Sequence, residues 1–151
     1  MQEKSKILIL SSAYLPLIGG SELAIKNITE RLLDFEFDLI TARLDKETAE
    51  YERISNVSMF RVGGSLSLAT FILPKMLLPI LTFFQAVKLL KKNKYIATHA
   101  YQASGAAGAG WLLKYFYPEL PLIVTLQEGK NLEEQGFLIN FFRFILLIDI
   151  A

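Results

Sequence analysis

The chain has 151 residues, of which 52% are hydrophobic and 21% are charged. That length fits one domain with a substantial core, and so apolar a composition excludes a disordered chain. The 16 basic and 15 acidic residues leave a net charge of +1, which provides no electrostatic footprint for nucleic acid. The absence of cysteine excludes disulfides and thiol catalysis, and the first apolar run is too short for a secretory signal.

The N-terminal part of the chain predicts a strand, a long loop and a helix. Ile7–Leu10 is a short aliphatic run, typical of a strand that is buried on both faces. The loop that follows ends in Gly19 and Gly20. Ser21–Leu33 then carries apolar residues at helical spacing, so we expect a helix there.

Strands and helices continue to alternate along the rest of the chain. The charged segment Arg43–Arg53 predicts a solvated connection, Trp111–Tyr117 predicts a helix, and the apolar Phe137–Ala151 predicts another. This alternation is typical of βαβ units. We therefore expect an α/β fold with a Rossmann-like, doubly wound, mainly parallel sheet. Further strands are predicted over Phe37–Thr41, Val57–Val62, Tyr95–Tyr101 and Leu122–Leu126.

The segment Leu66–Val87 is almost wholly apolar and has three interpretations. It fits a core helix with its connection, a patch at a membrane surface, or a membrane span. Lys75 and the helix-breaking Pro74 and Pro79 disfavour the span. The lysines that follow suit either anionic lipid or a solvated helix end. These lysines are Lys88, Lys91, Lys92 and Lys94.

The glycine pair is the most informative motif. Gly19 and Gly20 allow a ligand to approach the backbone without obstruction by a Cβ atom. The helix that starts beside them offers unpaired N–H groups and a positive dipole end, which suit a phosphate or diphosphate. Open α/β sheets bind ligands at this place, outside the carboxyl end of a strand. A purely structural turn is the alternative interpretation.

The same region resembles the N-terminus of family 4 glycosyltransferases. The resemblance is carried by Lys6–Leu10, Tyr14-Leu-Pro16 and the Gly-Gly-Ser-Glu sequence that opens the helix. Thr98–Tyr101 and Pro121–Leu126 are similar to later landmarks of that family. The resemblance implies that residues 1–151 form the N-terminal, acceptor-side domain of a GT-B fold, with the C-terminal donor domain absent.

The resemblance also implies a reaction. The enzyme would transfer a sugar from a nucleotide-sugar donor, with retention, without a metal or other cofactor, and this chain alone would be inactive. The acceptor is not identified and could be a lipid-linked or envelope glycan, and no catalytic residue is assigned. The donor diphosphate would lie against Gly19, Gly20 and Ser21. Candidates on the acceptor side are Glu22, His99, Tyr101, Gln127 and Glu128, although the family often has a histidine in the turn that Gln127 and Glu128 occupy.

Two other classes of protein compete with this interpretation. A nicotinamide or flavin enzyme needs a glycine-rich turn directly after the first strand, whereas Gly19 stands nine positions after Leu10. The small residues of Gly105–Gly110 fit close helix packing or, alternatively, a phosphate site. A non-enzymatic Rossmann-like module that binds a membrane or a partner is the second class. We expect a cytoplasmic protein, with peripheral contact at the inner face of the membrane left open.

Overall fold

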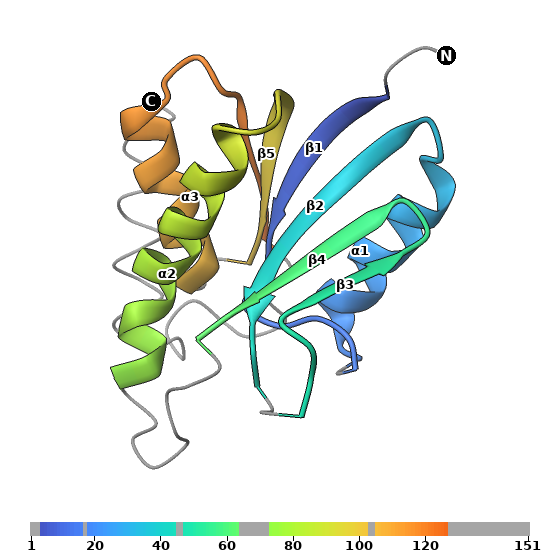
Figure 1. Cartoon of the computed structure of the whole chain (residues 1–151), viewed down its shortest axis with the longest axis horizontal. Helices are drawn as coiled ribbons and strands as arrows, with labels where there is room; N and C mark the ends of the chain where they lie inside the picture. Colours follow the sequence, from blue (N-terminus) through green and yellow to red (C-terminus); the bar gives the residue numbers. More distant parts are fainter. Residues whose placement is uncertain (1–3, 17, 45–46, 64–72, 103–104, 127–151) are drawn as a thin grey trace.

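The chain forms a six-stranded sheet with helices on both of its faces (Figure 1). The computed structural model describes residues 4–16, 18–44, 47–63, 73–102 and 105–126. The strands follow the order β3-β4-β2-β1-β5-β6. They are β1 (Ser5–Leu10), β2 (Phe35–Ala42), β3 (Tyr51–Ile54), β4 (Val57–Val62), β5 (Tyr95–Tyr101) and β6 (Leu122–Thr125). The helices are α1 (Gly20–Arg31), α2 (Leu73–Leu90) and α3 (Gly105–Phe116).

The sheet is parallel except at one edge. β1 pairs in parallel with β2 and with β5, and the pairs β2–β4 and β5–β6 are also parallel. β3 runs antiparallel to β4. The strand order reverses at β1, which has β2 on one side and β5 on the other. This topology confirms the predicted Rossmann-like, doubly wound and mainly parallel α/β sheet.

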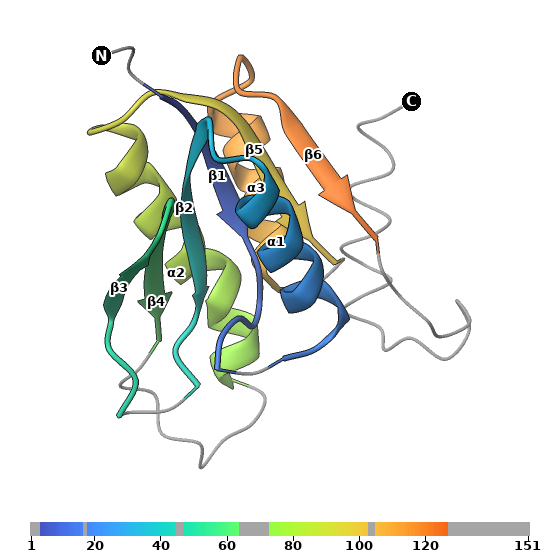
Figure 2. The ribbon, with the colours of Figure 1, turned by 90° about the vertical axis from the view of Figure 1, so that its right-hand side faces the viewer.

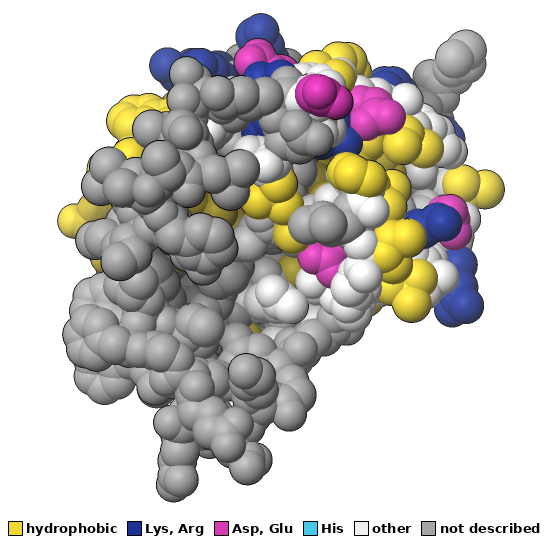
Figure 3. Space-filling model, turned by 90° about the horizontal axis from the view of Figure 1, so that it is seen from below, with side chains coloured by type: hydrophobic (Ala, Val, Ile, Leu, Met, Phe, Trp, Pro, Cys, Tyr) yellow, Lys and Arg dark blue, Asp and Glu magenta, His cyan; other side chains and the backbone are white. Residues whose placement is uncertain are grey.

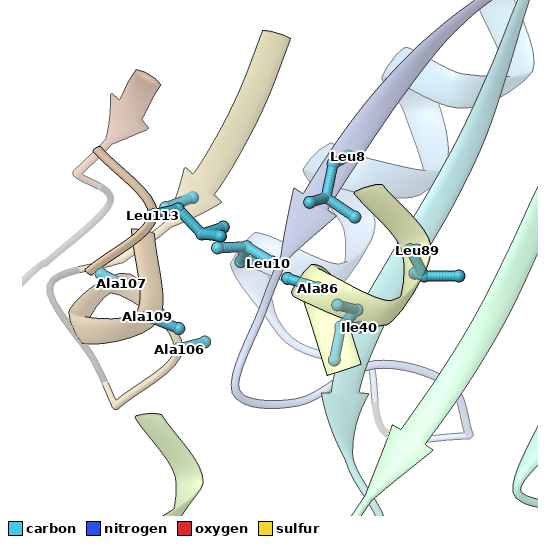
Figure 4. Close-up of a cluster of buried hydrophobic side chains, with 10 residues drawn as sticks. Leu8, Leu10, Ile40, Ala86, Leu89, Ala106, Ala107, Ala109 and Leu113 are labelled. Carbon is cyan, nitrogen blue, oxygen red and sulfur yellow. The ribbon is translucent and has the colours of Figure 1, made fainter. Parts of the chain in front are cut away.

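The pleat of the strands sends alternate side chains into two separate cores. On one face, Ile9, Phe37 and Leu39 pack with Ile25 of α1. On the other face, Leu10 and its neighbours pack with buried residues of α2 and α3 (Figure 4). Figure 2 shows α1 on the near side of the sheet and α2 and α3 behind it. Each face of the strand β1 is therefore buried, as its continuous aliphatic run predicts.

Helix α3 begins six residues earlier than the helix predicted over Trp111–Tyr117. Its first turns consist of glycine and alanine, and the residues from Ala106 to Gly110 are all buried. A Cβ atom added to Gly110 would lie 3.1 Å from Cδ1 of Leu122 and 3.6 Å from Cβ of Ala100. Close packing on the sheet therefore offsets the poor helix propensity of glycine. This contact supports the packing interpretation of the small residues.

Strand β3 corrects the prediction that Arg43–Arg53 is only a solvated connection. Its residues are all exposed, so its sequence shows no alternation that would distinguish a strand from a loop. The ladder with β4 and a ring contact between Tyr51 and Phe60, with centroids 5.2 Å apart, hold it at the sheet edge. Exposed, charged side chains are typical of an edge strand.

Helix α2 covers most of the long apolar segment. Leu78 is buried, and Ala86 and Leu89 belong to the buried cluster with residues of the sheet and α3, which agrees with a core helix from Leu73 onward. Among the helices that the structure describes, none combines the length and the apolar character that crossing a bilayer requires. The predicted connection over 66–72 and the helix predicted over Phe137–Ala151 lie outside the described residues.

Candidate functional site

The glycine pair lies where the prediction placed it, at the end of the sheet where the parallel strands stop. We call this end the carboxyl edge. β1 ends at Leu10, the loop follows, and Gly19 is the N-cap of α1 with an extended backbone. Both glycines are exposed, and a Cβ atom added to Gly20 would meet nothing within 4 Å. The start of α1 is therefore accessible on the side of Gly20. Contact with a ligand stays a prediction.

Gly19 has a different physical reason to lack a side chain. The carboxylate of Glu22 folds back over it, so that an added Cβ atom would lie 2.6 Å from Oε2 of Glu22. The hydroxyl of Ser21 donates a hydrogen bond to the same oxygen at 3.1 Å, and both side chains are buried. A glutamate three residues after the N-cap is the position from which a capping box reaches back. The glycine at position 19 thus accommodates the chain's own carboxylate.

Arg61 on β4 is a residue that the sequence-based list of site residues missed. Its side chain is only 3% exposed. Nη2 donates to the carbonyl oxygen of Leu15 at 3.2 Å and to Oε2 of Glu52 at 2.8 Å, and Nη1 donates to the carbonyl oxygen of Ala49 at 3.0 Å. We call residues 11–19, between β1 and α1, the glycine loop. The guanidinium therefore joins the glycine loop to the β3–β4 hairpin. The sequence does contain a signal for this role: Arg61 alternates with the apolar Val57 and Met59 and so lies on the buried face of the predicted strand.

A shallow hollow of about 250 Å³ lies beside this arginine at the carboxyl edge. Because the Arg61 guanidinium is already paired with Glu52 and two carbonyl groups, it offers little uncompensated charge to a ligand. The lining residues of the hollow are Tyr14, Leu15, Pro16, Ala42, Leu44, Thr48 and Arg61.

His99 and Tyr101 lie together at the end of β5. Their ring centroids are 4.3 Å apart, and a hydrogen bond of 2.7 Å joins Nε2 of His99 to Oγ1 of Thr125 on β6. Burial lowers the pKa of His99 below its usual value and raises the pKa of Tyr101. Tyr101 is 1% exposed, and its hydroxyl makes no hydrogen bond within the described part of the chain. His99 is thus neutral at neutral pH.

This burial predicts how stability depends on pH. The unfolded chain binds a proton on His99 near pH 6.5, whereas the folded chain binds it only at lower pH. The free energy of unfolding should therefore fall as the pH drops below about 6.5, because the unfolded state takes up the extra proton. We expect His99→Gln to remove this share of the pH dependence. Urea unfolding of both proteins between neutral and mildly acidic pH measures it, and parallel curves would contradict the assignment.

The structure brings some of the predicted site residues together and leaves others apart. Gly19, Gly20, Ser21 and Glu22 form one group at the start of α1, and His99 and Tyr101 form another on β5. Tyr101 shares an apolar cluster with Tyr14 of the glycine loop and Ile25 of α1, which links the two groups. Gln127 and Glu128 lie outside the described residues.

The carboxyl edge shows little positive charge among its described side chains. Figure 3 views the molecule from this end, and there the acidic atoms near the centre of the described surface are bordered by uncharged and hydrophobic ones. The lysine and arginine side chains lie mainly toward the rim of the view. No group of three His, Asp or Glu side chains that could hold a metal ion occurs within the described ranges.

Comparison with known proteins shows a shared fold. No family model and no curated protein matches the chain. A structure of sucrose-phosphate synthase from Thermosynechococcus elongatus matches with a TM-score of 0.65 and 16% identity, over 95% of this chain and 40% of that chain. A second structure of the synthase from the same organism matches with a TM-score of 0.59 and 16% identity, over 82% of this chain and 64% of that one.

The extent of these matches limits what they establish. This chain spans less than half of the length of the first synthase chain. At 16% identity the likeness concerns the fold and not the substrates. The chain therefore has a glycosyltransferase-like, Rossmann-like α/β fold. Membership of family 4 stays a prediction.

Proposed function

We propose that the chain is the N-terminal, acceptor-side domain of a GT-B glycosyltransferase that takes its sugar from a nucleotide-sugar donor. The observation that carries the proposal is the open backbone at Gly20, at the start of α1 and at the carboxyl edge of the sheet. Open α/β sheets bind ligands at this edge. The likeness to a sucrose-phosphate synthase, whose name describes the making of a sugar phosphate, supports the same class of reaction.

In this proposal the donor diphosphate lies over Gly20 and not over Gly19. The carboxylate of Glu22 already covers Gly19, and it would repel a phosphate placed there. The amides of Gly20 and Ser21 point from the first turn of α1, where the helix dipole favours negative charge. Fixed donors at this point stabilise the charge that grows on the departing diphosphate. This mode of stabilisation needs no metal ion.

The acceptor would lie on the other side of the same edge. There the neutral His99 can exchange hydrogen bonds with a sugar hydroxyl. Glu22 stays an acceptor-side candidate from the sequence, but its buried carboxylate lies over Gly19, next to the proposed donor position. Tyr101 is buried within the cluster, so we assign it a packing role beside His99. Gln127 and Glu128 remain acceptor-side candidates from the sequence. Retention and a glycan or lipid-linked acceptor remain parts of the proposal that come from the resemblance.

The substitution Gly20→Val tests the donor side. A branched side chain at Gly20 projects into open space, so the fold should stay intact while a diphosphate is kept from the amides. We expect the affinity for pyrophosphate or uridine diphosphate to fall by about tenfold to a hundredfold, the value of one or two hydrogen bonds to a charged group. Amide shifts of Gly20 and Ser21 during a titration measure this binding.

Ile18→Ser is the matched control, because Ile18 is an exposed loop residue that offers no amide of the first helical turn. Its affinity should equal that of the unmodified chain. Equal affinities in Gly20→Val and the unmodified chain would reject the assignment of the loop. Amide shifts confined to other parts of the molecule would reject it as well.

A further inference from the structure

The layer formed by α2 and α3 carries charge of one sign. From Leu73 to Pro118 the sequence contains six lysines and neither aspartate nor glutamate. Because the whole chain has a net charge of +1, the remainder of the chain is net negative. The lysines are Lys75, Lys88, Lys91, Lys92, Lys94 and Lys114, and the last five have exposed side chains. The positive charge is therefore concentrated on one side of the sheet.

A continuous row of aromatic rings runs across both helices of the same layer, and three of its five rings are exposed. The ring of Phe83 lies 5.7 Å from that of Phe84 and 5.5 Å from that of Phe116. The Phe116 ring lies 5.2 Å from Tyr115, whose ring is 6.2 Å from that of Trp111. Phe84 is 58% exposed, Tyr115 72% and Phe116 60%. We call these five residues the aromatic row.

The aromatic row and the lysines occupy one face of the layer. Among residues 77–90 of α2, the part whose side chains are described, the exposed positions are Ile80, Phe84 and Lys88, which are spaced by four residues and form one stripe on the helix. Lys91 and Lys92 follow directly at the end of α2, and Lys114 precedes Tyr115 on α3. Figure 1 shows both helices in the same layer, on the side of the sheet away from α1. Exposed rings are thus flanked by cations.

We propose that this face binds the surface of an anionic lipid bilayer. Aromatic rings favour the boundary between headgroups and acyl chains, and lysines reach the headgroup phosphates with their apolar stems packed on the surface. Each lysine near an anionic leaflet adds a favourable contribution. The inference is independent of the proposed sugar transfer.

Charge complementarity favours a bilayer over a second copy of the chain. In a symmetric dimer the same patch occurs on both sides of the interface, so the lysines would face lysines. The patch carries no acidic side chain to balance them. An anionic leaflet supplies the missing negative charge and an apolar layer at once.

Cosedimentation of the chain with vesicles tests the proposal. We expect binding to vesicles of phosphatidylcholine mixed with phosphatidylglycerol, and little binding to phosphatidylcholine alone. Added salt should weaken the binding, because exposed charges are screened.

Lys88→Gln/Lys91→Gln/Lys92→Gln should lower the partition constant by on the order of a hundredfold, at about one kcal/mol for each lysine. Phe84→Ser/Phe116→Ser should lower it by at least about tenfold, because two half-exposed rings no longer enter the boundary.

Leu33→Ser is the control for a lost exposed apolar side chain, and Lys26→Gln is the control for a lost lysine, since both residues lie on the α1 side. Both controls should bind like the unmodified chain, and circular dichroism should show that all variants are folded. The proposal is overturned if the unmodified chain ignores anionic vesicles, if it binds neutral vesicles equally well, or if the patch variants bind as the controls do. Sedimentation equilibrium that shows a dimer lost in Phe84→Ser/Phe116→Ser would assign the face to a second copy instead.

Discussion

We expect Gly110→Val to lower the free energy of unfolding by about 3 kcal/mol, because it overpacks a close contact between a helix and a sheet. A single Cβ atom at Gly110 would already lie 3.1 Å from Leu122 and 3.7 Å from Leu10, and valine adds two further methyl groups. Helix α3 would have to move away from the sheet. Urea unfolding followed by the fluorescence of Trp111, the next residue on α3, reports both the stability and the displacement.

Gly20→Val is the matched control for this experiment. It introduces the same side chain at a helical glycine, but there an added Cβ atom meets nothing within 4 Å. We expect its free energy of unfolding to change by less than about 1 kcal/mol, because valine is no worse than glycine in a helix. Equal losses at the two positions would mean that intrinsic propensity, and not the contact with Leu122, decides the outcome.

β1 could be predicted from the sequence, whereas the start of α3 could not. The run Ile7–Leu10 is short, aliphatic at every position and bounded by polar residues, which predicts a strand buried on both faces, and the structure agrees. The start of α3 has no such signal, because Gly105 to Gly110 reads as a loop by local propensity. Its helical state depends on contact with the sheet, through the neighbouring strands β5 and β6 and through Leu10 of β1, which is distant in sequence. The helical conformation of these residues is therefore determined by packing against the sheet and not by their helix propensity.

The same distinction applies to the candidate site. The position of Gly20 at the carboxyl edge follows from the order of strand, loop and helix, so the sequence predicts it. The spacing from Gly19 to Glu22 is that of a capping box, so the carboxylate over Gly19 was open to prediction from the sequence. The role of Arg61 depends on the edge strand β3. Because all residues of β3 are exposed, its sequence does not show the alternation that would predict a strand. Side-chain contacts between distant segments are the part that the sequence did not predict.

Arg61→Met should loosen the glycine loop and lower the free energy of unfolding by about 2–3 kcal/mol. The substitution keeps much of the apolar stem but removes the donors for the carbonyl groups of Leu15 and Ala49 and the partner of Glu52. Hydrogen bonds to a charged group contribute about 1.5–3 kcal/mol each, and Glu52 recovers part of the loss by hydration at the surface. ¹⁵N relaxation at Leu15, Ile18 and Gly19 should show larger-amplitude motion.

Arg53→Met on the neighbouring strand β3 is the matched control. Its guanidinium bonds Glu36 at 3.1 Å, but it is half exposed, and its hydrogen bonds within the described residues go to Ser55 and Glu36 and not to the loop. We therefore expect a cost of at most about 1 kcal/mol and unchanged loop motion. If Arg61→Met lowers stability while the loop relaxes normally, Arg61 only stabilises the fold. If the loop loosens but the unmodified chain shows no binding of pyrophosphate, Arg61 still positions the loop and the donor site is wrong. Because loop motion and ligand binding are measured separately, the position of the loop and its chemistry are judged independently.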